Sequence, residues 1–121
     1  MIEADLLAVS AAAHEYEHAL AAGDGAAALA FFDDAAETSR FGPEGAQLDR
    51  DAVVHLRTSS APTPPASWRH ESARPLGPDA VLHLAVLERG GATVQRTQIW
   101  RRTGDGWHIV HAHVSSPRSG V

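Results

Sequence analysis

The segment "TSSAPTPPA", residues 58–66, divides the chain into two parts with different patterns. Proline lacks an amide hydrogen and clashes with the preceding helical turn, so no helix continues through this run. Residues before it carry helical periodicity and helix caps, whereas residues after it carry strand composition and short turn signals. Helices followed by a sheet predict a single α+β domain over residues 1–121.

Three helices are predicted in the first part of the chain. Residues 2–21 show the three-and-four spacing of a single apolar helical face. That face is formed by Ile2, Leu6, Val9, Ala13, Tyr16 and Leu20. Gly23 is expected to end this helix, and Asp24 to cap a second helix that continues through Phe32. Asp49 is expected to cap a third helix, "RDAVVHLR".

The second part of the chain predicts a β-meander. From Ser67 on, four stretches of strand composition are separated by "LGPD", "GG" and "TGDG", which are turn signals for successive antiparallel hairpins. A further strand is expected at about residues 36–41. We expect the sheet to curl around the first helix as a cone whose open end forms a small-molecule pocket. The exposed face of the curled sheet is the expected homodimer surface.

Composition excludes several kinds of function. The chain contains no cysteine, which excludes disulfides, thiolate zinc sites and cysteine nucleophiles. All ten basic residues are arginines, which excludes lysine Schiff bases. A net charge of -5 without a basic stripe disfavours nucleic acid as a partner. No apolar run approaches the ~20 residues of a membrane helix and no signal peptide is evident, so we expect a cytoplasmic protein that does not contact a membrane.

The stretch "HEYEH", residues 14–18, matches the H-E-x-x-H zinc motif of metalloproteases. At ~100° per residue, His14 and His18 both point well away from the apolar face of the predicted helix. We therefore expect two solvated histidines rather than a metal site, and we predict no metal and no other cofactor.

Tyr16 is the one polar-tipped residue on the apolar face of the first helix, so its side chain should point inward. A buried tyrosine hydroxyl generally needs a hydrogen-bond partner. Two interpretations stay open: a core tyrosine bonded to the backbone, or an acid or base that lines the pocket. Arg40, in the strand of "TSRFGPEG", lies by alternation either inward with Thr38 or outward in solvent.

The order of elements and several motifs resemble the SnoaL-like, or nuclear-transport-factor-like, superfamily of cone-shaped α+β domains with a cystatin-like fold. Within it the chain is most similar to the AtzH-like and HpxZ-like proteins. The matching residues are Tyr16, Arg40-Phe41-Gly42, Arg57, Gln98-Ile99-Trp100 and the segment "GWHIVHAHVS", residues 106–115. The similarity covers nearly the full length. It departs at "PEGAQLDRD", residues 43–51, where the family has a Glu-Asn pair and a second glycine.

The resemblance implies an amidohydrolase, decarboxylating or not, that acts on a small carboxylated urea or amide. In this interpretation Arg40 binds the substrate carboxylate or polarises its carbonyl, because a guanidinium suits bidentate binding of a carboxylate. Tyr16 transfers the proton, and the neighbouring cation favours its phenolate. Further substrate-binding residues are expected at Arg57, Gln98, Trp100 and His113.

His111 and His113 lie two apart on the last strand and so share a face with Trp107 and Ile109, which we expect to be the concave one. Two roles stay open for His113: a hydrogen-bonding residue of the pocket, or a side chain that only fills space. No carboxylate clearly joins the two histidines, so they are not predicted to bind a metal. Gln98 and Trp100 also share one face of their strand, and the pattern is compatible with either facing.

Two other functions stay open. A non-catalytic protein could hold a metabolite or a partner in the same cone, since a fold alone does not assign function. An isomerase or polyketide-cyclase relative would need a carboxylate in an apolar pocket. The strand offers Arg40 instead, and an arginine cannot abstract a proton at neutral pH. The expected partner of the pocket is a small anionic or ureide-like molecule.

Overall fold

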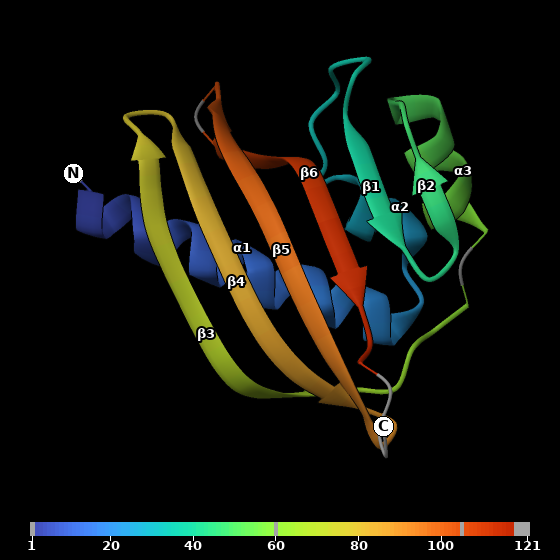
Figure 1. The fold of residues 1–121 in the computed structure, drawn as a ribbon. Helices are drawn as coiled ribbons and strands as arrows, with labels where there is room; N and C mark the ends of the chain where they lie inside the picture. Colours follow the sequence, from blue (N-terminus) through green and yellow to red (C-terminus); the bar gives the residue numbers. More distant parts are fainter. Residues whose placement is uncertain (1, 60, 105, 118–121) are drawn as a thin grey trace.

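The computed structural model describes residues 2–59, 61–104 and 106–117. Over these residues, three helices and six strands follow one another (Figure 1). They are α1 (Ile2–Ala22), α2 (Gly25–Leu29), β1 (Ser39–Gly42), β2 (Gly45–Gln47), α3 (Arg50–Thr58), β3 (Ala66–Gly77), β4 (Ala80–Arg89), β5 (Ala92–Thr103) and β6 (Gly106–Ser115). None of the helices in this part of the chain is long and apolar enough to span a membrane.

The strands form one sheet in the order β2-β1-β6-β5-β4-β3. Strands β3 to β6 are the predicted antiparallel meander, with its three turns where the sequence signals placed them. At the other edge, β1 pairs with β6 in parallel and with β2 in an antiparallel hairpin. The sequence predicted only one strand in this region, and β2 was missed because three residues are too few to show an alternating pattern.

The helices begin at the predicted caps. The Asp24 carboxylate accepts a hydrogen bond from the Ala27 amide at 3.0 Å, and the Asp49 carboxylate accepts one from the Ala52 amide at 2.9 Å. Such caps satisfy amide groups that have no partner within the helix. The helix α2 is shorter than predicted, because the chain leaves it before Phe32 and joins the sheet through a bridge to Ile109.

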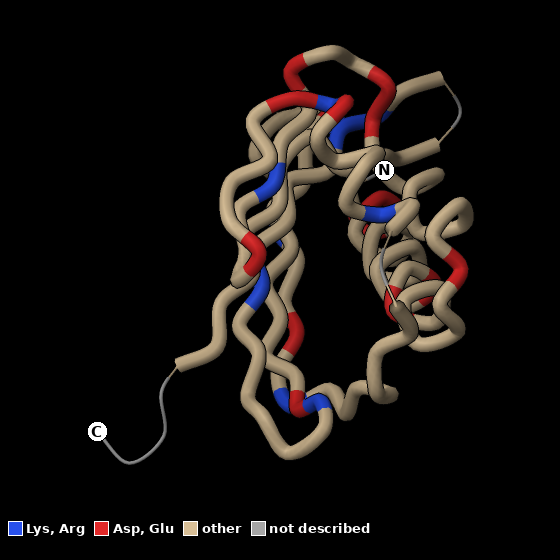
Figure 2. The backbone as a smooth tube through the Cα atoms, turned by 90° about the vertical axis from the view of Figure 1, so that its right-hand side faces the viewer, with Lys and Arg blue, Asp and Glu red and all other residues tan. Residues whose placement is uncertain are grey.

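The molecule has two layers, with α1 lying diagonally across one face of the curved sheet and the strands bending around it (Figures 1 and 2). The core lies between these layers and includes the fully buried Trp100 and Ile109 of the sheet. From α1 it receives Val9, Ala13 and Tyr16, as the apolar face predicted. The first residue of that predicted face does not reach the core, since Ile2 is 62% exposed.

Candidate functional site

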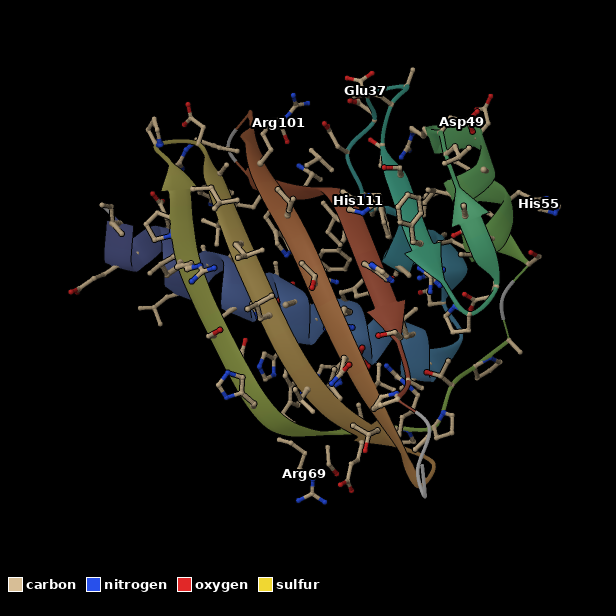
Figure 3. All side chains as sticks on the ribbon, in the orientation of Figure 1. Glu37, Asp49, His55, Arg69, Arg101 and His111 are labelled. Atoms are coloured by element: carbon tan, nitrogen blue, oxygen red, sulfur yellow. The ribbon has the colours of Figure 1, made fainter. Side chains whose placement is uncertain are left out.

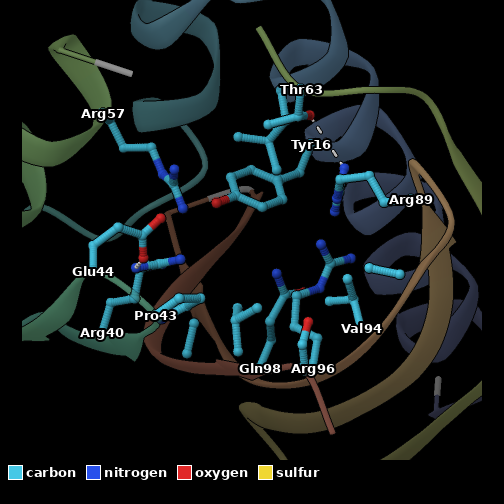
Figure 4. Close-up of a pocket in the computed structure, with 15 residues that line it drawn as sticks. Tyr16, Arg40, Pro43, Glu44, Arg57, Thr63, Arg89, Val94, Arg96 and Gln98 are labelled. Atoms are coloured by element: carbon cyan, nitrogen blue, oxygen red, sulfur yellow. Dashed lines mark hydrogen bonds and ion pairs between the residues drawn. The ribbon is translucent and has the colours of Figure 1, made fainter. Parts of the chain in front are cut away.

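A cavity of about 300 Å³ opens between the C-terminal half of α1, the helix α3 and the concave face of the sheet (Figure 4). Its wall is unusually rich in arginine. The charged and polar side chains that the following paragraphs use are Arg40, Arg57, Arg89, Arg96, Tyr16 and Gln98. These residues come from β1, α3, β4, β5 and α1, so the cavity exists only in the folded chain.

Arg40 points inward from β1 and is 3% exposed. It stands opposite Ala112 of β6 and Gln47 of β2. Its Nη1 donates hydrogen bonds to Glu44 at 2.9 Å and to Gln47 at 3.2 Å. The guanidinium lies over Gly42, where an added Cβ would be only 2.7 Å from Nη1. The glycine after "RF" therefore leaves the space that the arginine head group occupies.

Glu44, in the turn between β1 and β2, faces Arg40 and lines the same cavity. Partial burial acts to raise the pKa of its carboxyl, but the hydrogen bond from Arg40, a backbone hydrogen bond and the charges of Arg40 and Arg57 together outweigh this effect, and the pKa is lowered. Glu44 is therefore a carboxylate that is already engaged by a cation. It balances part of the positive charge of the wall and is not a free base.

Tyr16 is 3% exposed and its hydroxyl points across the cavity toward Arg57 and Arg40 (Figure 4). Arg57, from the last turn of α3, places its guanidinium carbon 5.6 Å from the centroid of the Tyr16 ring, within reach of a cation–π contact. Burial lowers the pKa of Arg57, and its attraction to the neighbouring Tyr16 hydroxyl acts in the opposite direction. The Tyr16 ring thus lies within cation–π reach of two guanidinium groups, those of Arg57 and Arg96.

The other side of the cavity holds Arg89 and Arg96, which share Glu17 of α1. Arg89 binds Glu17 with both terminal nitrogens, at 2.8 and 2.9 Å, and Arg96 donates from Nη1 to the same carboxylate. Burial acts to raise the pKa of Glu17, but the two arginines more than compensate and it is lowered. Glu17 is 6% exposed and stays an anion because of these partners.

The cavity carries both excess charge and unsatisfied donors. Four guanidinium groups meet two carboxylates, Glu17 and Glu44, which leaves an excess of two positive charges. In the described part of the chain, several buried nitrogens at its wall have no hydrogen-bond partner: Arg40 Nε, Arg57 Nε, Arg96 Nε and Nη2, and Gln98 Nε2. A buried donor without a partner costs about 1–3 kcal/mol. A small ligand rich in oxygen acceptors would match both properties.

Four of the six residues predicted for the site, Tyr16, Arg40, Arg57 and Gln98, line this cavity. Trp100 faces the same way but lies deeper, fully buried in the core, where its Nε1 donates to Gln98 Oε1 at 3.1 Å. It therefore orients the Gln98 amide and does not itself form part of the wall.

His113 is not in the cavity, and the prediction of its facing was wrong. The strand β6 carries a register shift, since Ile99 pairs with His111 while Trp100 pairs with Ile109. The extra residue reverses the alternation, so Ile109 faces the core and His111 lies on the opposite face of the sheet (Figure 3). His113, two residues further along the strand, is exposed on that same face. There both rings contact the exposed Phe41 edge-to-face.

The two histidines of "HEYEH" also differ from each other. His18 is exposed, as predicted, but His14 stacks on Trp68 of β3 with the ring centroids 3.9 Å apart. His14 Nε2 is 2.9 Å from the Glu71 carboxylate, which also accepts from Ser10 and lies 2.7 Å from His83 Nε2. Over the described residues, no group of three or more histidine, aspartate or glutamate side chains is arranged to hold a metal ion.

Three residues of the site, Arg89, Arg96 and Glu17, were not predicted from the sequence. Arg96 had a usable signal, since it alternates with Gln98 and Trp100 in "RTQIW" and must share their face. Glu17 and Arg89 had none, because 72 positions separate them in the chain and only the fold brings them together.

Comparison with known families and structures is consistent with this architecture. The family model described as AtzH-like matches residues 3–119. This chain belongs to the AtzH-like family. Among solved structures, it is similar to a cystatin-like fold protein from Burkholderia xenovorans, with 30% identity, a TM-score of 0.82 and coverage of 91% of this chain and 89% of that one.

Two further structures are also similar. A protein of the DUF3225 family from Pectobacterium atrosepticum has 26% identity and a TM-score of 0.84, with coverage of 93% of this chain and 91% of that one. An NTF2-like protein from Pseudomonas putida has 17% identity and a TM-score of 0.81, with coverage of 99% and 92%, and shows the fold alone. Curated proteins give no match to the chain.

Proposed function

We propose that this AtzH-like domain is an amidohydrolase that binds a small carboxylated urea or amide in the arginine-lined cavity. The observation that carries the proposal is the set of buried donors without partners on the walls formed by Arg40, Arg57, Arg96 and Gln98. Carboxylate and urea oxygens are the acceptors that such donors lack in the free protein. A volume of about 300 Å³ suits a molecule of this size.

Arg40 is proposed to bind the ligand carboxylate or the carbonyl oxygen. Its Nη1 is held by Glu44 and Gln47, which fixes the guanidinium plane, while its Nε has no partner among the residues described. A cation fixed in this way stabilises negative charge that develops on a carbonyl oxygen without having to reorganise.

Tyr16 is proposed to transfer the proton. Water adds to the carbonyl carbon, the C–N bond breaks, the leaving nitrogen takes a proton from the Tyr16 hydroxyl, and the attacking water returns a proton to the phenolate oxygen. The hydroxyl points toward Arg57 and Arg40 (Figure 4), so the phenolate formed on the way lies among cations. If the product is a carbamate, it takes up a proton and splits into amine and carbon dioxide.

The test is the release of ammonia and carbon dioxide from small carboxylated ureas and amides at pH 7. Arg40→Met should reduce turnover by at least about 100-fold, the scale expected for one lost transition-state donor. Its melting temperature should change little, because the lost hydrogen bonds are offset by relief of repulsion among the arginines. Arg69→Met is the matched control, since Arg69 is 57% exposed on β3 and should leave turnover unchanged. Full activity of Arg40→Met would rule out this mechanism.

One observation favours a second candidate, a protein that binds the same anion without chemistry. Both carboxylates next to the cavity, Glu17 and Glu44, are paired with arginines, so neither is free to activate water. Calorimetric binding of a carboxylated urea with no product after prolonged incubation would support the binding function and contradict the enzyme.

A further inference from the structure

Arg96 has a complete hydrogen-bonding edge that no described residue uses. It is 4% exposed, and only its Nη1 has a partner, Glu17. The atoms without a partner are Nε and Nη2. These two N–H groups point in the same direction from the planar guanidinium, and together they form the edge that binds a carboxylate through two parallel hydrogen bonds.

Arg96 is not needed to neutralise the charge of Glu17. Arg89 already contacts both oxygens of Glu17, from Nη1 and Nη2, and is further held by Thr63 at 3.2 Å. Arg96 therefore adds a second cation to a carboxylate that is already paired. Its guanidinium carbon lies 5.5 Å from the Tyr16 ring centroid and 5.7 Å from that of Trp68, so two aromatic rings and Glu17 fix its position. An immobilised cation with a free edge is typical of a ligand-binding arginine.

Gln98, the next inward residue on β5, adds one more donor. Its Oε1 accepts the hydrogen bond from Trp100 Nε1, which fixes the orientation of the amide. Its Nε2 is buried and has no partner in the described chain. Gln98 and Arg96 both rise from the sheet toward Tyr16 (Figure 4). Strand β5 thus carries two neighbouring inward side chains, Arg96 and Gln98, whose unpaired buried atoms are all hydrogen-bond donors.

These donors lie apart from Arg40. The strand β6 separates β1, which carries Arg40, from β5, which carries Arg96. Two strand spacings correspond to about 10 Å between the backbones. A ligand whose carboxylate is bound by Arg40 would therefore have to present a second acceptor group to reach Arg96.

We infer that Arg96, positioned by Glu17 and assisted by Gln98, is a specificity-determining residue that binds the acceptor group at the end of the ligand opposite Arg40. This inference rests on the proposed function, namely that the cavity binds a small carboxylate through Arg40. It adds that the site selects molecules with anionic or acceptor groups at both ends, and that the arginine of β5 makes the selection.

The experiment compares succinate with butyrate, two four-carbon acids that differ in one carboxylate, by calorimetric titration at pH 7. Wild-type protein should bind succinate at least about 10-fold more tightly than butyrate. Arg96→Met should bind succinate no more tightly than butyrate and leave the butyrate affinity unchanged. Arg40→Met should weaken the binding of both acids. Arg69→Met is the control, since Arg69 is 57% exposed on β3 and does not line the cavity, and it should keep the full selectivity.

Arg96→Lys guards against misfolding of Arg96→Met, because it keeps the positive charge next to Glu17 but lacks the two-donor edge. It should fold and lose the same selectivity. Equal affinities of the wild type for the two acids, or unchanged selectivity in Arg96→Lys, would overturn the inference while leaving the role of Arg40 intact. Failure of the wild type to bind either acid would overturn the proposed function and this inference with it.

Discussion

Replacing Glu71 by glutamine should remove a large, pH-dependent part of the stability of the domain. Glu71 of β3 accepts from Ser10, and lies beside His14 and His83, so it links α1 to two strands. Burial acts to raise its pKa, but these hydrogen bonds outweigh it and lower the pKa from 4.5 to about 2. The folded state therefore holds the ionised carboxylate much more strongly than the unfolded state does.

The shift corresponds to about 3 kcal/mol, because one pKa unit is worth ~1.4 kcal/mol. The side chain is 25% exposed, so water screens the interaction, and we expect about 2 kcal/mol. Since the folded pKa is lowered, this stability is fully present above pH 4.5 and is lost as the pH falls toward 2. Glu71→Gln should therefore be less stable at pH 7 and should respond less to acid.

The measurement is urea unfolding at several pH values between 7 and 3. The difference in unfolding free energy between wild type and Glu71→Gln should be about 2 kcal/mol at pH 7 and should shrink steadily below pH 4.5. Glu88→Gln is the control, because Glu88 is 44% exposed and pairs with Arg69 at the surface, so its loss should be far smaller than that of Glu71→Gln. A difference between wild type and Glu71→Gln that stays constant from pH 7 to 3 would refute the reasoning.

Two further substitutions test the local structure. Gly42→Ala should displace the Arg40 guanidinium, because the new Cβ would lie 2.7 Å from Nη1. Calorimetry should show succinate binding weakened by about 10-fold, with little loss of stability. An unchanged affinity would contradict this prediction. Asp49→Ala removes the cap that accepts from the Ala52 amide and should cost about 1 kcal/mol in urea unfolding. Asp51→Ala, two residues later in the first turn and exposed, should cost clearly less.

The secondary structure could largely be predicted because local chemistry determines it. Asp24 and Asp49 cap their helices through contacts three residues away, and the turns of the meander are encoded in four residues or fewer. The inward facing of Arg40 was one of two predicted alternatives, and the buried Thr38 and Arg40 confirm it. The inward facing of Tyr16 followed from the helical periodicity, whereas the strand pattern left the facing of Gln98 open and its burial decides it.

The features that could not be predicted are an irregularity within one strand and contacts between residues far apart in the sequence. A single extra residue in β6 reverses the facing of His111 and His113, and nothing in "HIVHAHV" indicates where the extra residue lies. The contact of Glu17 with Arg89 and the stacking of His14 on Trp68 join positions more than fifty residues apart. Such contacts are set by the curvature of the sheet around α1, and no short stretch of the sequence determines that curvature.

The choice of arginine for every cation at the cavity affects how a bound anion can be released. A guanidinium keeps its charge throughout the pH range in which proteins stay folded. No histidine is among the described residues of the wall, and Glu44 has a lowered pKa, so mild acidification removes no charge from the wall. Acid can then release a carboxylate ligand only by protonating the ligand itself, at about pH 4. The proposed binding of a small carboxylate should therefore be insensitive to pH over the whole neutral range.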